Sequence, residues 1–222
     1  MKTHIVFVII VALCGFGCTR LKQGGNGKCE GNSLGDYVFD LPITISPAND
    51  TLHLGDTIWV EQDFSENMVN LQNGKTYPVK DFDFGMYFRI ENIGVDTSYA
   101  ISSWQVVPKI GSAISGNGGF GQSCQIKHEY NNGRYQIKFG VVVHETGVFA
   151  TWLDTDYRYD PLAAYGQHIT DCRPEYLLLY FNTNNKAENG YHLYQASPDS
   201  RVSTLPRENY DYGGHFSFVV LP

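Results

Sequence analysis

Hydrophobic and polar residues alternate along most of this chain, and a period of two is the pattern of a β-strand with one buried face. The segment 37–45 is the clearest case, because every second position from Tyr37 to Ile45 is apolar. Pro42 lies within it and has no N–H to donate, so we expect this strand at a sheet edge. Further strands are predicted at 51–64 (two strands around Gly55 and Asp56), 82–93, 97–107, 125–129, 135–143, 147–153, 176–181, 191–195 and 215–220.

The segments between these strands favour an all-β fold. Asn131-Asn132-Gly133 is the strongest hairpin signal in the chain, since Asn-Gly adopts the positive φ angles of a tight turn between paired strands. The uncharged, glycine-rich segment 111–123 is interpreted as a loop or as a junction between two halves. No segment has the 3.6-residue period of an amphipathic helix. The sequence therefore predicts a β-sandwich of about ten strands over residues 36–222, with a division into two domains near 111–123 as the alternative.

The first 17 residues have the composition of an export signal. Lys2 supplies a positive charge, and residues 5–13 form an unbroken apolar segment. That segment is too short to span a bilayer stably, which needs about 20 residues. A basic start, a short apolar core and small residues before the cleavage site are typical of a signal peptide.

The residues at the end of this leader, Gly15, Gly17 and Cys18, resemble the lipobox of bacterial lipoproteins. The resemblance implies cleavage before Cys18 and acyl chains on that residue, hence an outer-membrane lipoprotein whose membrane partner is reached through its N-terminal lipid. An ordinary secreted protein is the alternative. Residues 18–35 are glycine-rich and contain few apolar residues, so they predict a flexible tether with a mean reach of about 20–25 Å. The periplasmic face and the cell surface both remain open as locations.

Two further segments resemble small, uncharacterised lipoproteins of Bacteroidetes-type bacteria. The first is 41–64, with a Leu-Pro strand, a Pro-containing turn and a Gly-Asp-Thr-Ile strand, and the second is the closing segment 213–219. Gly147 with Phe149 two residues later resembles the penultimate strand of immunoglobulin-like modules. These resemblances imply an immunoglobulin-like β-sandwich body and an envelope location, but no particular activity.

Composition agrees with a β-rich extracytoplasmic protein. Aromatic residues make up 14% of the chain and charged residues only 18%. The leader carries one positive charge, Lys2, so its removal changes the net charge from −7 to −8. An acidic body is not expected to bind nucleic acid.

The cysteines remaining after cleavage are odd in number. Cys29, Cys124 and Cys172 would enter an oxidising compartment, where one disulfide and one free thiol is the simplest outcome. Cys172 precedes an apolar strand, and we expect it to pair with Cys124 or with Cys29. Three reduced thiols are the alternative.

Asp154, Asp156 and Asp160 lie close together after a predicted strand and offer oxygen ligands of the kind that Ca²⁺ prefers. The segment lacks the sixth-position glycine and the closing glutamate of an EF-hand, so a solvated loop is favoured. No cofactor is predicted. A glycan hydrolase that brings Glu61, Asp154 and Glu175 together by folding is the alternative to a non-catalytic role.

An aromatic segment follows the same strand and is the candidate ligand site. Tyr157, Tyr159 and Tyr165 with Asp160 could stack on a sugar and bind its hydroxyl groups, whereas packing of a tyrosine-rich sandwich is the simpler interpretation. The sequence therefore predicts an envelope protein that binds a glycan or another envelope protein, or that has a structural accessory role.

Overall fold

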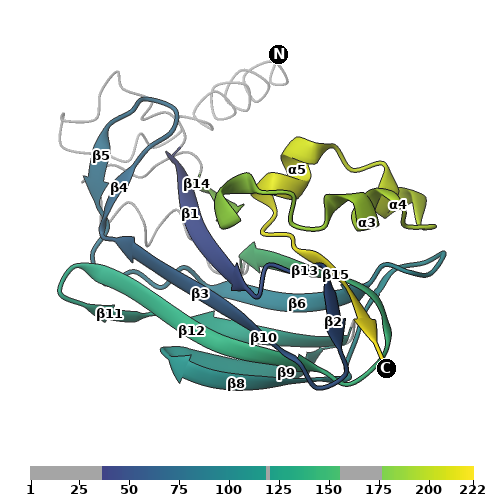
Figure 1. The fold of residues 1–222 in the computed structure, drawn as a ribbon. Helices are drawn as coiled ribbons and strands as arrows, with labels where there is room; N and C mark the ends of the chain where they lie inside the picture. The colour runs from purple at the N-terminus through teal and green to yellow at the C-terminus, as the bar shows by residue number, and fades with distance from the viewer. Residues whose placement is uncertain (1–36, 119–120, 156–176) are drawn as a thin grey trace, which may run out of the picture. The chain divides into compact units, whose positions relative to one another are not determined.

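β-Strands dominate the computed structural model, which describes residues 37–118, 121–155 and 177–222 (Figure 1). They form two main sheets and a small hairpin, β4 (Asn67–Val69) with β5 (Thr76–Pro78). The predicted all-β sandwich is confirmed. The described residues contain 15 strands, more than the ten expected, because several are only two or three residues long.

The first sheet has six strands in the order β11-β12-β3-β1-β14, and β8 also pairs with β12. Its bounds are β1 (Tyr37–Ser46), β3 (Thr57–Ser65), β8 (Trp104–Ile110), β11 (Glu129–Asn131), β12 (Arg134–Val143) and β14 (Leu177–Thr183). The predicted hairpin is present, since β11 and β12 pair around Asn132 and Gly133.

The second sheet has seven strands in the order β2-β15-β13-β6-β10-β9, and β7 also pairs with β6. Its bounds are β2 (Thr51–His53), β6 (Met86–Asn92), β7 (Tyr99–Ala100), β9 (Ser112–Gly118), β10 (Gly121–Lys127), β13 (Gly147–Thr155) and β15 (Ser217–Leu221).

The core lies between the two sheets and is formed by the apolar positions of the alternating pattern. Phe39 on β1, Phe139 on β12 and Phe88 on β6 are fully buried in one cluster. The rings of Phe88 and Phe139 meet edge to face from opposite sheets, with centroids 5.3 Å apart. Successive side chains of a strand point to opposite sides of the sheet. On each strand, the polar positions that alternate with the buried apolar ones therefore face outward.

The expected edge position of β1 is wrong for the strand as a whole. β1 lies between β3 and β14, yet its two pairings occupy different parts of the strand. Residues 37–43 pair in parallel with β14, whereas only Thr44–Ser46 pair with β3. Pro42 therefore lies where β1 has a single strand partner, so its missing N–H removes no bond to β3.

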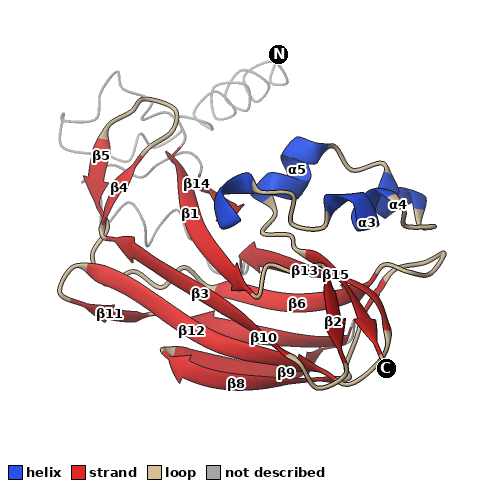
Figure 2. Ribbon diagram, viewed as in Figure 1, coloured by secondary structure: helices blue, strands red, loops and turns tan. Residues whose placement is uncertain are grey.

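The prediction of a strand at 191–195 is also wrong. These residues form α3 (Tyr191–Gln195), which is followed by α4 (Ser200–Ser203) and α5 (Arg207–Tyr212), and the 3-10 helix η1 (Asn184–Lys186) precedes them. We call residues 184–212 the helical cap. Figure 2 shows its helices gathered beside β13 and β15, away from β3 and β12. Tyr194, Val202 and Tyr210 of the cap form a second apolar cluster with Ile93 and Ala150 of the sheet.

The segment 111–123 is not a loop between halves. Most of it forms β9 and the start of β10, which pair with each other and continue the seven-stranded sheet from β6. Glycine makes this close packing possible at Gly121, where φ is +104° and a Cβ would lie 2.3 Å from the carbonyl oxygen of Ala100. At Gly121, at least one of the glycines that suggested a loop is required by a close approach of the backbone to Ala100.

The leader, Cys18 and the tether lie outside the described residues, so the predictions of cleavage, lipidation and a flexible tether stay predictions. Among the residues that are described, no helix is long and apolar enough to cross a membrane.

Candidate functional site: the Trp59 face

An aromatic side chain lies on the outward face of the six-stranded sheet. On β3, Ile58 and Val60 are buried in the core, so Trp59 and Glu61 between and after them point outward. Trp59 pairs with Gly140 on β12 and with Ser46 on β1. An indole ring at this position is partly exposed instead of contributing to the core.

Gly140 gives the ring its position on the sheet. A Cβ added at Gly140 would lie 3.2 Å from Cζ3 of Trp59, 3.3 Å from its Cη2 and 2.8 Å from Cγ2 of Thr57. The ring of Trp59 therefore extends across β12 at the one place where that strand has no side chain. A glycine inside a strand is typical of such a close approach.

A lysine lies over the indole ring. The ammonium group of Lys109, from the β8 segment beside β12, is 5.7 Å from the ring centroid. This is a cation–π contact at an exposed site, worth about 0.5–1 kcal/mol. A long, exposed side chain held so weakly can move aside when a ligand approaches the ring.

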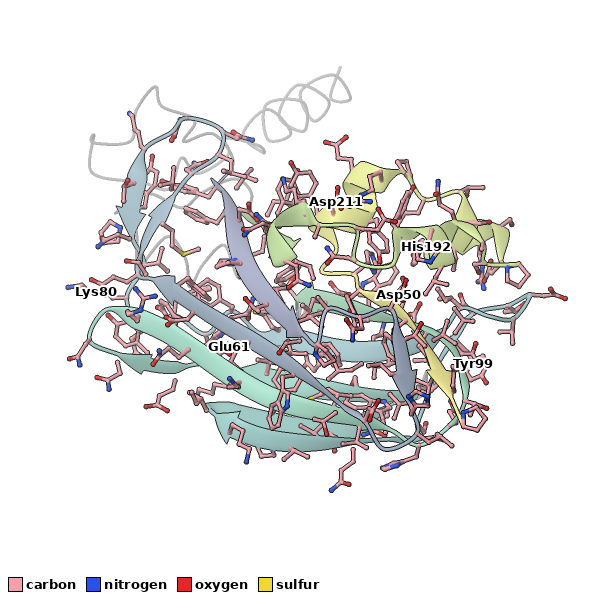
Figure 3. All side chains as sticks on the ribbon, in the orientation of Figure 1. Asp50, Glu61, Lys80, Tyr99, His192 and Asp211 are labelled. Carbon is pink, nitrogen blue, oxygen red and sulfur yellow. The ribbon has the colours of Figure 1, made fainter. Side chains whose placement is uncertain are left out.

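Charged groups flank the ring on the next row of the sheet. Glu61 is labelled on β3 in Figure 3, and its Oε2 accepts a hydrogen bond of 2.8 Å from Nζ of Lys138 on β12. Glu61 also pairs with Thr44 of β1, whose side chain is exposed. We call Trp59, Glu61, Lys109, Lys138 and Gly140 the Trp59 face. It combines an apolar ring with hydrogen-bond acceptors and donors, which is the chemistry that recognises the apolar face and the hydroxyl groups of a sugar.

The structure does not bring Glu61 and Asp154, two of the three proposed catalytic carboxylates, together. Glu61 lies on the outward face of the six-stranded sheet. Asp154 lies on β13 beside the buried Leu153 and opposite Tyr87, on the outward face of the other sheet. The core separates these two faces, and Glu175 lies outside the described residues.

The whole of the predicted ligand site, and most of the calcium alternative, falls outside the described residues. Asp156, Tyr157, Tyr159, Asp160 and Tyr165 lie outside the described residues, so both their ligand role and the calcium alternative stay predictions. Among the described residues, no three His, Cys, Asp or Glu side chains are grouped so that they could hold a metal ion.

Cys124 is a free, buried thiol on β10. Burial raises the pKa of this thiol to about 12, so it stays protonated. The structure thus has no disulfide at Cys124. Cys29 and Cys172 lie outside the described residues, and a bridge between them stays a prediction.

Two histidines, the buried His215 and the partly buried His128, make side-chain contacts within the fold. The Nε2 atom of His128 lies 2.9 Å from Oε1 of the buried Gln62, and His215 packs against Trp152 and Tyr210 with Nδ1 2.9 Å from the carbonyl oxygen of Thr151. Burial lowers the pKa of each to about 4. These contacts hold sheet and loop residues together and lie apart from the Trp59 face.

Compared with known proteins, the chain matches no protein-family model and none of the curated proteins. The site therefore rests on the geometry of its own residues.

Apart from Glu61, which was a candidate only for the hydrolase alternative, the residues of the Trp59 face were not predicted as a site, although the sequence contains two signals for them. Trp59 occupies the polar phase of an alternating strand, where Thr57 and Glu61 are its neighbours on the same face. Gly140 interrupts the most strongly β-forming segment of the chain. Neither signal says that the two positions are opposite each other, because that register depends on the fold.

Proposed function

We propose that this protein is a lipid-anchored lipoprotein of the bacterial outer membrane whose β-sandwich acts by binding and not by catalysis, and that the Trp59 face binds a glycan. The observation that carries the glycan proposal is the partly exposed indole ring lying across Gly140, with the exposed side chain of Lys109 over it. Glu61 and Lys138 beside the ring offer an acceptor and donors for hydroxyl groups.

The anchor rests on the leader and on its resemblance to a lipobox. Gly17 and Cys18 follow a short apolar segment, and a glycine-rich tether separates Cys18 from the first described strand. Two or more acyl chains hold a protein on a membrane stably, since each buried methylene contributes about 0.8 kcal/mol. The resemblance of 41–64 and 213–219 to lipoproteins of Bacteroidetes-type bacteria supports the same location.

The anchor is tested by replacing Cys18 with alanine in the full chain. We expect C18A to lose its acyl chains and to leave the membrane fraction, measured by fractionation of the cells and by mass spectrometry of the mature N-terminus. C14A is the matched control, because Cys14 is the other leader cysteine and should have no effect. Unchanged fractionation and processing of C18A would refute the anchor.

Glycan binding is tested with the full chain in detergent against arrays of neutral oligosaccharides and polysaccharides, followed by calorimetry on those that bind. We expect W59A to weaken the affinity at least about tenfold, as removal of an aromatic contact at the centre of a binding site does. G140A should weaken it as well, because a Cβ there displaces the ring without removing it.

W152A is the matched control for this experiment. Trp152 is also partly exposed, but it lies on the other sheet with Arg89 over its ring. Its removal should leave glycan affinity unchanged. Equal affinity of W59A and the wild-type protein would exclude the Trp59 face, and no binding to any glycan would exclude the glycan proposal.

A further inference from the structure

Asp40 and Asn182 form a polar contact between β1 and β14, outside the Trp59 face. In the parallel register Asp40 pairs with Tyr180 and Pro42 with Asn182, so the two side chains are diagonal neighbours on the outward face. Nδ2 of Asn182 donates a hydrogen bond of 3.1 Å to Oδ2 of Asp40. This contact joins residues 142 positions apart in the chain.

The hydrogen bond leaves one oxygen atom of each side chain unused, and neither of these two atoms has a hydrogen-bond partner. Oδ1 of Asp40 and Oδ1 of Asn182 are both buried, and neither has a hydrogen bond. Both atoms are acceptors when the carboxyl group is ionised, so neither can satisfy the other. A buried acceptor without a donor is costly, and such groups in a native protein require an explanation.

A single proton satisfies both atoms. A carboxylic acid and a primary amide can pair through two hydrogen bonds, one from the amide N–H to the carbonyl oxygen of the acid and one from the acid O–H to the amide oxygen. The first of these bonds is the one observed. We propose that Asp40 carries a proton on Oδ1 and donates it to Oδ1 of Asn182, so that the two side chains form an acid–amide pair tying β14 to β1.

A nearby positive charge would favour the ionised form of Asp40, but the charged groups around the pair have only a weak effect of this kind. Lys186 on η1 is exposed, and its ammonium group lies 4.1 Å from the ring centroid of Tyr212 on α5. Asp211 on α5 also acts on Lys186. Burial raises the pKa of Asp40 more than the Asn182 hydrogen bond and the charge of Lys186 lower it.

The pair makes the attachment of β14 sensitive to pH. β14 has β1 as its only strand partner among the described residues, apart from a single bridge between Phe181 and Gly213. The folded state raises the pKa of Asp40 above its ordinary value of 3.8, so the stabilisation is complete below that value and is lost as the pH rises through the folded pKa. Above it, a buried carboxylate oxygen lacks a donor and β14 is held less tightly.

The decisive variant is D40N, which supplies an N–H where the proposal places the acid proton. An amide–amide pair needs no proton, so D40N should melt about 2–6 °C above the wild-type protein at pH 7.5 in detergent, with the difference shrinking toward pH 4. D40L removes the charge equally but leaves the amide of Asn182 unpaired, and it should melt below D40N throughout.

Infrared difference spectra of wild-type protein against D40N provide a second measurement. A band of a protonated carboxyl group should appear in the wild-type protein at a pH above 3.8 and be absent from D40N. The pair is refuted if D40L is as stable as D40N, or if the band is absent. None of these results depends on the Trp59 face, so they leave the glycan proposal untouched.

Discussion

The β1–β14 contact and the helical cap each contain a carboxyl group, and the two environments shift its pKa in opposite directions. Asp40 is half-buried and receives one hydrogen bond, from an uncharged amide. Asp199 is 2% exposed and accepts bonds from the backbone N–H groups of Ser98 (2.8 Å) and Arg201 (2.9 Å) and from the guanidinium group of Arg201. The pKa of Asp40 is raised by burial, whereas the hydrogen bonds hold the pKa of Asp199 well below its usual range.

The difference shows that hydrogen bonds to a carboxylate, that of the Arg201 guanidinium group foremost, can outweigh the effect of burial on its pKa. Asp199 is the more buried of the two carboxylates and is the one that stays ionised. The pH dependences are opposite as a result. The contribution of Asp199 is present above the unfolded pKa of 3.8 and is lost as the pH falls through the folded value, whereas that of Asp40 is present in acid.

The largest expected effect is that of D199A. Asp199 is the N-cap of α4 and at the same time accepts from Ser98 in the segment after β6, so it joins the cap to the seven-stranded sheet. Without it two backbone N–H groups lose their acceptor. We expect the melting temperature to fall by roughly 5 °C or more at pH 7, measured by circular dichroism.

D40N is the matched control for D199A, because it also removes one carboxylate and is expected not to lower the melting temperature. A fall of less than about 1 °C for D199A would show that the cap is held by its apolar cluster alone. Equal losses for D199A and D40N would remove the contrast between the two carboxylates.

The β-sandwich was predictable from the sequence because the alternation of apolar and polar residues that indicates a strand lies within each strand's own segment. At 37–45 and 135–143 the alternation identifies most of the buried side chains, since one face of each strand meets the core, although Val38 is buried out of phase. The partners were not predictable. The pairing of β1 with β14 joins segments about 140 residues apart, and nothing local in either segment specifies a parallel register.

The cap was missed because its helices are too short to show a period. The helix α4 has four residues and α3 has five, so neither completes two turns. Asp199 immediately before α4 was a usable signal, since Asp is a preferred N-cap residue. Tyr191 and Leu193 instead fitted an alternating pattern, and tertiary contacts of Tyr194 decided the helix.

The Trp59 face was missed for a related reason. An aromatic residue in the polar phase of a strand marks an exposed ring, but its site depends on Gly140 from another strand. The predicted ligand residues 157–165 were chosen for their composition, and their arrangement is not described. The sequence gives the type of each residue. Which other residues lie beside it in a site depends on the pairing of strands that are far apart in the chain.

The smallest expected effect is that of R201A, which removes the guanidinium donor to Asp199 but keeps the backbone N–H donors. The Arg201 guanidinium group makes the shortest contact, with Nη2 2.6 Å from Oδ2, yet its side chain is 67% exposed. Because the Arg201 side chain lies mostly in solvent, R201A should lower the melting temperature less than D199A does. The pKa of Asp199 should rise but stay below its usual value, because the backbone donors of Ser98 and residue 201 remain. R134A is a suitable control, since Arg134 makes an ion pair with Asp63 in which both side chains are exposed. If R201A instead destabilised the protein as much as D199A, the arginine and not the backbone would hold the carboxylate, and the contrast with Asp40 would be one of charge pairing alone.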